Sequence, residues 1–567
     1  MLAALDTLKA HPDELENCLK APALINSIDI SVTDYYVRFL PQDSIQFAKL
    51  RKDTSLTLFD FPLDYEIIQT GDYYHDPAIN GPYTWLYTRV PKDYVFPENI
   101  KHEVLDELFI IENSPYYSSE IVDENGPMKS RGVQSHEMND LLKTLEAISF
   151  FNSGYRYGEK KSGKPDGPRK LKRMVEKKFL WKTWYEYEYY PSGTIKVESY
   201  HEIDRNGVSR RYSTLTAVPL KGVKVFLWDG FFKWNSAYTD HTGYYESDIY
   251  YNNELYYYLH FSGKNTINSW DLDRITLGGV CLWVQKMSLS DGRESNDTFN
   301  TTVKISSEGW DACVTNNAFF EFMTISRLEG LSQPPFHLQV ALRESTGAHS
   351  APLFQNHTNT LLDGLHAPFF ALHFLTAGST IIYQGAYLLF QQSLPDILIS
   401  GGSLNSKKTA NDADRKTFFN SFYSSIWHEL THASHFQSMV RNAGSGVASR
   451  YWSKLIGTEV GHGITSLFDK FYGSKGDSNW EMVALAEGWA YYIERTFGIK
   501  YIDYYQSKTV FPWNNRLLFY RLKIAGCNIS DLEKYLFVTN LSDYKNYLID
   551  VYPLQSEVIT NIFKDYE

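Results

Sequence analysis

Hydrophobic and polar positions follow two periods along this chain, and the longer period marks two helices in its last third. Between Asp414 and Met439 there is no glycine or proline. Apolar side chains recur there at spacings of three and four, namely Phe419, Phe422, Ile426, Leu430 and Ala433. A second run, Asn479–Glu494, also lacks proline and is rich in small and apolar residues. The pattern predicts an amphipathic helix over Asp414–Met439 and a buried helix over Asn479–Glu494.

A period of two marks strands in the middle of the chain. Residues Trp184–Tyr190 and Ile195–Glu198 alternate on either side of a Pro-Ser-Gly turn at 191–193, which predicts a hairpin. Four further elements are expected before the first long helix. They are a helix over Thr315–Leu328, a strand over Phe336–Leu342, a helix over 366–392 and a strand over Asp396–Ile399.

The first long helix carries the sequence His428-Glu429-Leu430-Thr431-His432, an HExxH pattern. Residues four apart on a helix lie about 40° apart around its axis and one turn along it, so both imidazoles can reach one metal ion. Glu429, about 100° from His428, is better placed beside a water on the metal than on the metal itself. Ile426 and Leu430 lie on the opposite side, so the histidines are expected to face a cleft or a second layer. Core histidines satisfied by backbone carbonyls are the structural alternative.

A catalytic zinc site takes three protein ligands and keeps one position open, so a third donor is expected downstream. Three glutamates compete for this position, namely Glu459, Glu481 and Glu487. An alanine precedes Glu487 and a glycine follows it, which lets its helix approach the motif helix closely. The sequence therefore favours His428, His432 and Glu487 as ligands of one zinc ion per chain, with Glu459 and Glu481 as alternatives.

The HELTH motif, followed on a second helix by Glu487 and the residues Gly-Trp-Ala, resembles the gluzincins, zinc metallopeptidases whose third ligand is a distal glutamate. The resemblance covers roughly residues 310–500. The longer metzincin pattern HExxHxxGxxH is not met, because His435 stands in place of its glycine and Ser438 in place of its last histidine. His435 is thus not expected as a ligand, although it lies on the same helix face. A narrower similarity is to exported metallopeptidase-like proteins of Bacteroidetes-type bacteria.

The gluzincin resemblance implies hydrolysis of peptide bonds, with a peptide or protein as substrate. Glu429 would accept a proton from the attacking water, while a tyrosine or histidine would stabilise the oxyanion. Tyr491, four residues after Glu487 and so on its face, is one candidate donor, and His462 is another. Two other classes stay open: a binding protein with a degenerate peptidase domain, and a carbohydrate-active hydrolase with paired carboxylates and aromatic platforms.

A second resemblance lies upstream of the motif. Residues Val218–Leu227 and Ala237–Tyr245 are similar to the β-sandwich modules of the carboxypeptidase-regulatory and transthyretin-like type, in which PLxGVxV opens a strand and TDxxGxY turns into the next. The match spans residues 213–265, and the residues Asp240–Gly243 are of the types that favour a tight turn. Four aromatics between these strands are expected to pack in the core or a loop, with a binding face as the alternative: Trp228, Phe231, Phe232 and Trp234.

Length and composition describe a large globular protein. A chain of 567 residues is expected to form three or four domains. We expect a multidomain α+β fold, with a β-sandwich module followed by a zincin-like, largely helical catalytic domain. The expected domains are an N-terminal α+β domain of unassigned role over 1–155, a linker and β-hairpin segment over 156–212, the β-sandwich module over 213–305, and the metallopeptidase domain over 306–567.

The charge, the cysteines and the apolar runs of the sequence limit which binding partners and which location we expect. The net charge of −12 argues against nucleic acid as the main partner. The basic stretch Glu159–Lys178 is interpreted as a solvated linker, with a polyanion-binding patch as the alternative. Four widely spaced cysteines form no CxxC, so neither a cysteine-based zinc site nor a dense disulfide framework is indicated. No run of 18 apolar residues and no signal peptide at Met1–Asp6 are found in the sequence. The family resemblance nevertheless implies an exported protein.

Overall fold

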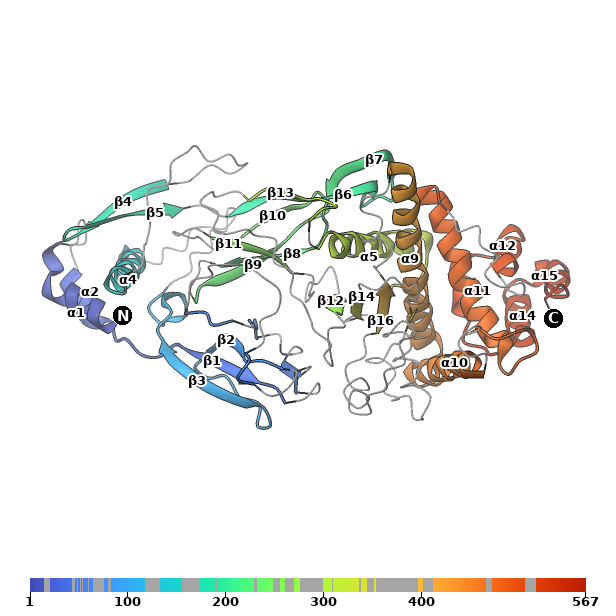
Figure 1. Ribbon diagram of the computed structural model, residues 1–567, viewed down its shortest axis with the longest axis horizontal. Helices are drawn as coiled ribbons and strands as arrows, with labels where there is room; N and C mark the ends of the chain where they lie inside the picture. Colours follow the sequence, from blue (N-terminus) through green and yellow to red (C-terminus); the bar gives the residue numbers. More distant parts are fainter. Residues whose placement is uncertain are drawn as a thin grey trace.

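The computed structural model contains both helices and sheets, as the expected α+β class requires. Figure 1 shows the N-terminal elements at one end of the molecule, strands in the middle and helices α9 to α15 at the other end. The structure describes residues 1–14, 21–42, 46–47, 49–50, 53, 55–59, 61–64, 76–79, 83–117, 133–154, 173–188, 191–228, 232–247, 255–260, 270–275, 299–307, 309–335, 338–343, 351–352, 396–400, 411–465, 472–504 and 516–566.

The N-terminal part combines helices with a small antiparallel sheet of order β2-β1-β3. The helices bury their own apolar cluster, which also takes Phe179 and Trp184 from the following hairpin. The N-terminal core thus extends past residue 155. Its elements are α1 (Leu2–Ala10), α2 (Ala21–Ser27), β1 (Asp34–Leu40), β2 (Leu86–Pro91), β3 (Lys101–Leu108) and α4 (Val133–Asn152).

The hairpin predicted around residues 191–193 is wrong. The first of its strands is β5 (Lys182–Glu188), which pairs antiparallel with β4 (Arg173–Phe179) in a two-stranded sheet. The second is β6 (Ser192–Ile203), which pairs with β7 (Ser209–Pro219) instead. Alternation identifies strands but not their partners, because pairing depends on side-chain contacts made across the sheet. The basic stretch interpreted as a linker also enters β4 at Arg173, and residues 155–172 lie outside the described part.

Two sheets share one core in the middle of the chain. In the first, β6 lies between β10 (Tyr244–Glu246) and β13 (Thr301–Val303) and also pairs with β7. In the second, β8 (Lys224–Trp228) lies between β9 (Trp234–Tyr238) and β11 (Tyr256–His260). Buried side chains of both sheets belong to one cluster, which continues into the helices around the HExxH motif. Because β6 lies outside residues 213–305 and pairs with β7, β10 and β13, one of the two sheets of the expected module depends on a strand beyond that stretch.

The aromatic side chains of this region pack inward. Trp228 is fully buried and meets Tyr36 and Phe59 of the N-terminal part in a separate cluster. Phe232 and Trp234 are half-buried against the same cluster. These contacts confirm core packing for Trp228, Phe232 and Trp234, whereas Phe231 lies outside the described residues.

A mixed sheet of order β12-β14-β16-β15 precedes the motif helix. Its strands β12 (Trp270–Ile275), β14 (Leu338–Arg343) and β16 (Ile397–Ser400) are parallel, while β15 (Ala351–Pro352) pairs antiparallel with β16. The strands predicted at Phe336–Leu342 and Asp396–Ile399 are therefore confirmed as β14 and β16. The helix predicted over 366–392 lies outside the described residues.

Helix α5 (Trp310–Glu329) confirms the prediction over Thr315–Leu328. It begins after Gly309 and ends at Gly330, and both glycines have a positive φ. At the C-terminal end this left-handed conformation lets the Gly330 N–H donate to the Ser326 carbonyl and close the last turn. A residue with a side chain would be strained there.

The two long helices predicted from periodicity are α9 (Asp412–Ala443) and α11 (Trp480–Phe497). At the start of α9, the Asn411 side chain accepts a hydrogen bond from the Asp414 backbone N–H, a cap worth about 1 kcal/mol. Helix α9 packs against α5, α11 and α10 (Ser445–Thr465), which explains why its middle is buried on every side (Figure 1).

Four shorter helices complete the C-terminal part: α12 (Arg516–Ile524), α13 (Ile529–Lys534), α14 (Leu541–Val551) and α15 (Ser556–Phe563). They pack around α11 and the C-terminal half of α9. Among the residues described, no helix has the length and hydropathy needed to span a bilayer.

Candidate metal centre

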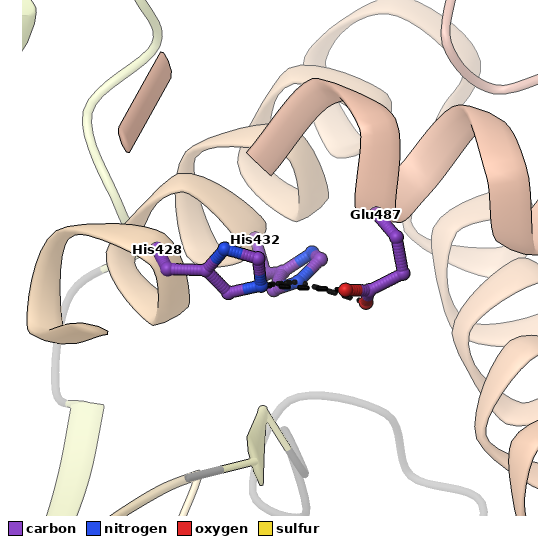
Figure 2. A group of neighbouring side chains, drawn as sticks. All are labelled: His428, His432 and Glu487. Atoms are coloured by element: carbon purple, nitrogen blue, oxygen red, sulfur yellow. Dashed lines mark hydrogen bonds and ion pairs between the residues drawn. The ribbon is translucent and has the colours of Figure 1, made fainter. Parts of the chain in front are cut away.

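Two neighbouring helices bring the three predicted ligands together. His428 and His432 project from successive turns of α9, and Glu487 projects from α11 toward both rings (Figure 2). All three side chains are buried, with between 1% and 7% of each residue exposed. Within the described residues, this is the one group of histidine, cysteine and carboxylate side chains whose spacing fits a metal ion. The group could therefore hold such an ion.

The distances between the donor atoms fit a tetrahedral ion. The Nε2 atoms of His428 and His432 lie 3.2 Å apart. Glu487 Oε1 lies 3.1 Å from His432 Nε2, and Glu487 Oε2 lies 3.3 Å from His428 Nε2. Tetrahedral coordination at about 2.0–2.1 Å per bond requires donors about 3.3–3.4 Å apart. Each of the three separations lies within about 0.3 Å of this spacing, with Glu487 Oε1 facing His432 and Glu487 Oε2 facing His428. Two histidines and one carboxylate are a donor set that zinc accepts.

Glu494, a residue outside the predicted ligand set, orients one of the two rings. Its Oε2 lies 3.1 Å from His428 Nδ1, while its Oε1 accepts a 2.6 Å hydrogen bond from Ser424 Oγ. A carboxylate beside Nδ1 keeps the proton on that nitrogen, so the lone pair of a neutral His428 points from Nε2 into the cluster. The histidines thus meet carboxylates and each other through their ring nitrogens, and the alternative of pairing with backbone carbonyls is not found at His428.

Charges in the cluster strongly perturb its titration. Burial lowers the pKa of His428, but hydrogen bonds with Glu487 and Glu494 outweigh it and place that pKa well above its usual value. Burial also dominates at His432, whose pKa is lowered. At Glu487, burial opposes ionisation, yet the two histidines hold the pKa at about 2. The carboxylates thus create a strongly negative pocket that favours a cation between these three side chains.

Glu429 lies beside the candidate ligands without joining them. It is 5% exposed, and its Oε2 has no hydrogen-bond partner among the described residues. Burial raises the pKa of Glu429 to about 8, with Glu487 and Glu494 contributing and His428 opposing. An unpartnered carboxylate oxygen next to a metal site can accept a hydrogen bond from water there.

No family model, curated protein or solved structure matches this chain. The resemblance to gluzincins therefore rests on the motif residues alone. The structure adds that two histidines four residues apart and a glutamate from a second helix form a buried group that could hold a metal ion.

The two predicted oxyanion donors differ in their surroundings. The Tyr491 ring lies 4.5 Å from the His428 ring, measured between centroids, and its hydroxyl is hydrogen-bonded with Tyr472. The structure thus brings Tyr491 to the cluster. His462, on α10, packs against Gly473, where a Cβ atom would come within 2.5 Å of the His462 ring. The role of either residue in stabilising an oxyanion stays a prediction.

The competing glutamates occupy other positions. Glu481, in the first turn of α11, accepts a hydrogen bond from the Leu541 backbone N–H at 2.9 Å. Glu459 lies on α10. Burial raises its pKa well above the usual value, and the negative charges of Glu487 and Glu429 raise it further. His435 Nε2 donates to the Leu536 carbonyl at 2.9 Å. None of the three belongs to the group that could hold a metal.

A sequence signal for Glu494 was available. Glu494 lies seven residues after Glu487, and Ser424 lies four residues before His428, so each falls on the face of its own helix that carries a ligand. An acidic residue two turns beyond Glu487 on the same helix face could thus have been predicted to hydrogen-bond a histidine of the neighbouring helix.

Proposed function

We propose that this chain is a zinc-dependent peptidase of the gluzincin type. The observation that carries the proposal is the close approach of the His428, His432 and Glu487 side chains, whose facing nitrogen and oxygen atoms lie 3.1–3.3 Å apart. Oε2 of Glu429, which has no hydrogen-bond partner among the described residues, lies beside them. When bound, zinc would polarise the scissile carbonyl and make a neighbouring water more acidic.

The residues of the chain would divide the proton transfers between them. Glu429 would accept a proton from the attacking water at its free Oε2 and deliver it to the departing amine nitrogen. Glu494 would keep the proton of His428 on Nδ1, so that Nε2 stays available as a donor to the metal. The Tyr491 hydroxyl would donate a hydrogen bond to the oxyanion that forms on the former carbonyl oxygen.

The arrangement of the mixed sheet supports a peptide as the substrate. Strand β15 is the antiparallel edge strand of this sheet among the described strands, and it lies against α9. An exposed strand edge can pair with an extended peptide through main-chain hydrogen bonds. A substrate held in this way beside the motif helix would present its backbone carbonyls to the cluster.

The test combines metal content with turnover in the full-length chain. Zinc-loaded protein should contain one zinc per chain and cleave peptides in a quenched-fluorescence library. His428→Ala, His432→Ala and Glu487→Gln should lose zinc, while the matched controls Glu459→Gln and Glu481→Gln should retain it. Glu429→Gln should retain zinc and lose at least about 100-fold in turnover.

Two results would contradict the proposal. A chain that stays free of zinc after reconstitution would remove the metal site, and an undiminished rate in Glu429→Gln would remove the general base. Mapping the cleavage products of the library would also distinguish endopeptidase from exopeptidase action.

A further inference from the structure

The β4–β5 hairpin ends in a tryptophan that points away from the protein. Residues Leu180 and Trp181 form the two-residue turn, because Phe179 and Lys182 are the last pair of the ladder. Trp181 is 81% exposed, and it is the only exposed tryptophan among those whose surroundings the structure describes. Tryptophan is usually well buried in soluble proteins, so this exposure calls for an explanation.

Buried neighbours fix the base of the turn, so Trp181 has a defined position on the surface. Phe179 and Trp184 are 2% and 1% exposed, and both belong to the apolar cluster of α1, α2 and α4. Leu180 packs against the same cluster and has a φ of 54°, a left-handed conformation that costs a leucine roughly 1–2 kcal/mol. Anchoring Leu180 inward leaves the next side chain directed outward.

Two lysines flank the turn. Lys178, at 57% side-chain exposure, lies 3.0 Å from Glu176 Oε1, and Lys182 Nζ lies 5.1 Å from the centre of the Phe151 ring. In the sequence, residues 159–182 contain ten basic and three acidic residues, a net charge of +7, whereas the whole chain carries −12. In the sequence, positive charge is therefore concentrated in β4 and the residues that precede it.

We propose that the tip of the β4–β5 hairpin docks onto an anionic lipid surface. An indole ring prefers the level of the lipid headgroups, where its apolar body and its N–H are both accommodated. Lysines beside it gain about 1 kcal/mol each near a negatively charged leaflet. One apolar anchor together with a basic patch provides the two signals that reversible membrane binding requires.

The shape and charge of the molecule favour a membrane over another polyanion. Proteins that bind single-stranded nucleic acids align several aromatic rings along a basic groove, whereas this tip presents one ring on a projecting turn. The net charge of −12 would also repel a polyanion that wraps the protein. Figure 1 shows the hairpin beside α1 at the end of the molecule away from α9 and α11, so a docked protein would keep the candidate metal centre away from the bilayer.

The experiment is co-sedimentation of the full-length chain with vesicles. The vesicles contain phosphatidylcholine alone, or phosphatidylcholine with phosphatidylserine at about three to one, a composition that gives a negative surface. The chain should bind the anionic vesicles, and added salt should weaken the binding. Trp181→Ala should lower the partition coefficient at least about tenfold, and Lys182→Gln should lower it roughly fivefold.

Leu554→Ser is the matched control, because Leu554 is 95% exposed at the C-terminal end of the molecule and should not affect binding. Equal binding of Trp181→Ala and the parent chain would overturn the proposal. So would binding to soluble heparin or polynucleotide with none to anionic vesicles. Zinc content and peptidase activity are not read in this test, so its outcome is independent of the proposed function.

Discussion

The two candidate histidine ligands are supported differently at their second ring nitrogens. Glu494 and Ser424 form a hydrogen-bonded chain that ends at Nδ1 of His428. Nδ1 of His432 is buried and has no partner among the described residues. Since a carboxylate on the outer nitrogen fixes the ring and raises its basicity, His428 is expected to be the better oriented ligand.

Replacing Glu494 tests this support. In Glu494→Gln the side chain keeps its size but loses its charge, so it holds the Nδ1–H of His428 with a weaker, neutral hydrogen bond. Zinc affinity should fall about 10- to 100-fold, measured by competition with a chromogenic chelator. Glu481→Gln is the control on the same helix, since Glu481 bonds the Leu541 backbone instead. Unchanged affinity in Glu494→Gln would show that His428 needs no such support.

A buried ionic network joins the strands in the middle of the chain to the motif helix. Lys221 follows β7, Glu321 lies on α5 and Tyr423 lies on α9. Lys221 Nζ lies 2.8 Å from Glu321 Oε1, and the Tyr423 hydroxyl donates to Glu321 Oε2 at 2.8 Å. Lys221 and Glu321 are each 1% exposed. The network thus connects three elements that are distant in sequence, one of them α9.

Breaking one side of this network should be costly. Lys221→Met removes the cation and leaves the Glu321 carboxylate buried without a compensating charge. The free energy of unfolding should fall by about 3 kcal/mol or more in a urea titration. Arg210→Met is the matched control, because Arg210 is 59% exposed and pairs with Glu202 near the surface. Its cost should stay below about 1 kcal/mol, and a similar loss in both variants would contradict the expectation.

A second contact between elements makes stability depend on pH. Glu533, on α13, accepts hydrogen bonds from Ser434 Oγ on α9 and from the Ser332 backbone N–H. Burial raises the pKa of Glu533 to about 7, although these hydrogen bonds oppose the shift. A raised carboxyl pKa means that the folded chain binds the proton more tightly than the unfolded chain. The resulting stabilisation is complete below about pH 4.5 and is lost as the pH rises through about 7.

Glu533→Gln removes this titration while imitating the protonated carboxyl. Between pH 5 and pH 7.5, the parent chain should lose about 2 kcal/mol relative to the variant. Thermal unfolding of both proteins across that range measures the difference. A difference that stays constant, or that grows in the opposite direction, would show that Glu533 does not carry the shift.

The candidate metal centre and the strands in the middle of the chain share one hydrophobic core. That core runs from Ile195 on β6 through Val225 on β8 and Phe322 on α5 to Leu430 on the motif helix. The sequence favoured a β-sandwich module whose motif match spans residues 213–265, but β7 and β10 pair with β6, and Pro219 and Lys221 are hydrogen-bonded to Asn316 and Asn317 on α5. We therefore expect the protein to unfold without this stretch, rather than to lose one independent unit.

Deleting residues 213–265 tests this expectation. The deletion removes β10 and most of β7, which both pair with β6, and it removes the Lys221 cation beside α5. The product should take up no zinc and show no cooperative unfolding, measured by elemental analysis and by circular dichroism during heating. A folded deletion protein that still binds one zinc would restore the interpretation as a separable module.

Local patterns predicted the two long helices of the C-terminal part. The spacing of apolar residues over Asp414–Met439 identified α9, and the small residues beside Glu487 identified α11 as its neighbour. Helical geometry alone placed His428 and His432 one turn apart. The pairing of β5 with β4, and of β6 with β7, was not predictable in this way. Alternating residues encode which face of a strand is buried, and they do not encode which strand lies beside it.

The sequence by itself determined the ligand spacing on one helix, because residues four apart on an α-helix share a face whatever surrounds them. The tertiary structure decided everything that involves two helices. It placed Glu487 rather than Glu459 or Glu481 at the histidines, and it brought Glu494 to His428 across the contact between α11 and α9. Contacts between helices depend on how the whole core packs around them, and no local pattern specifies that packing.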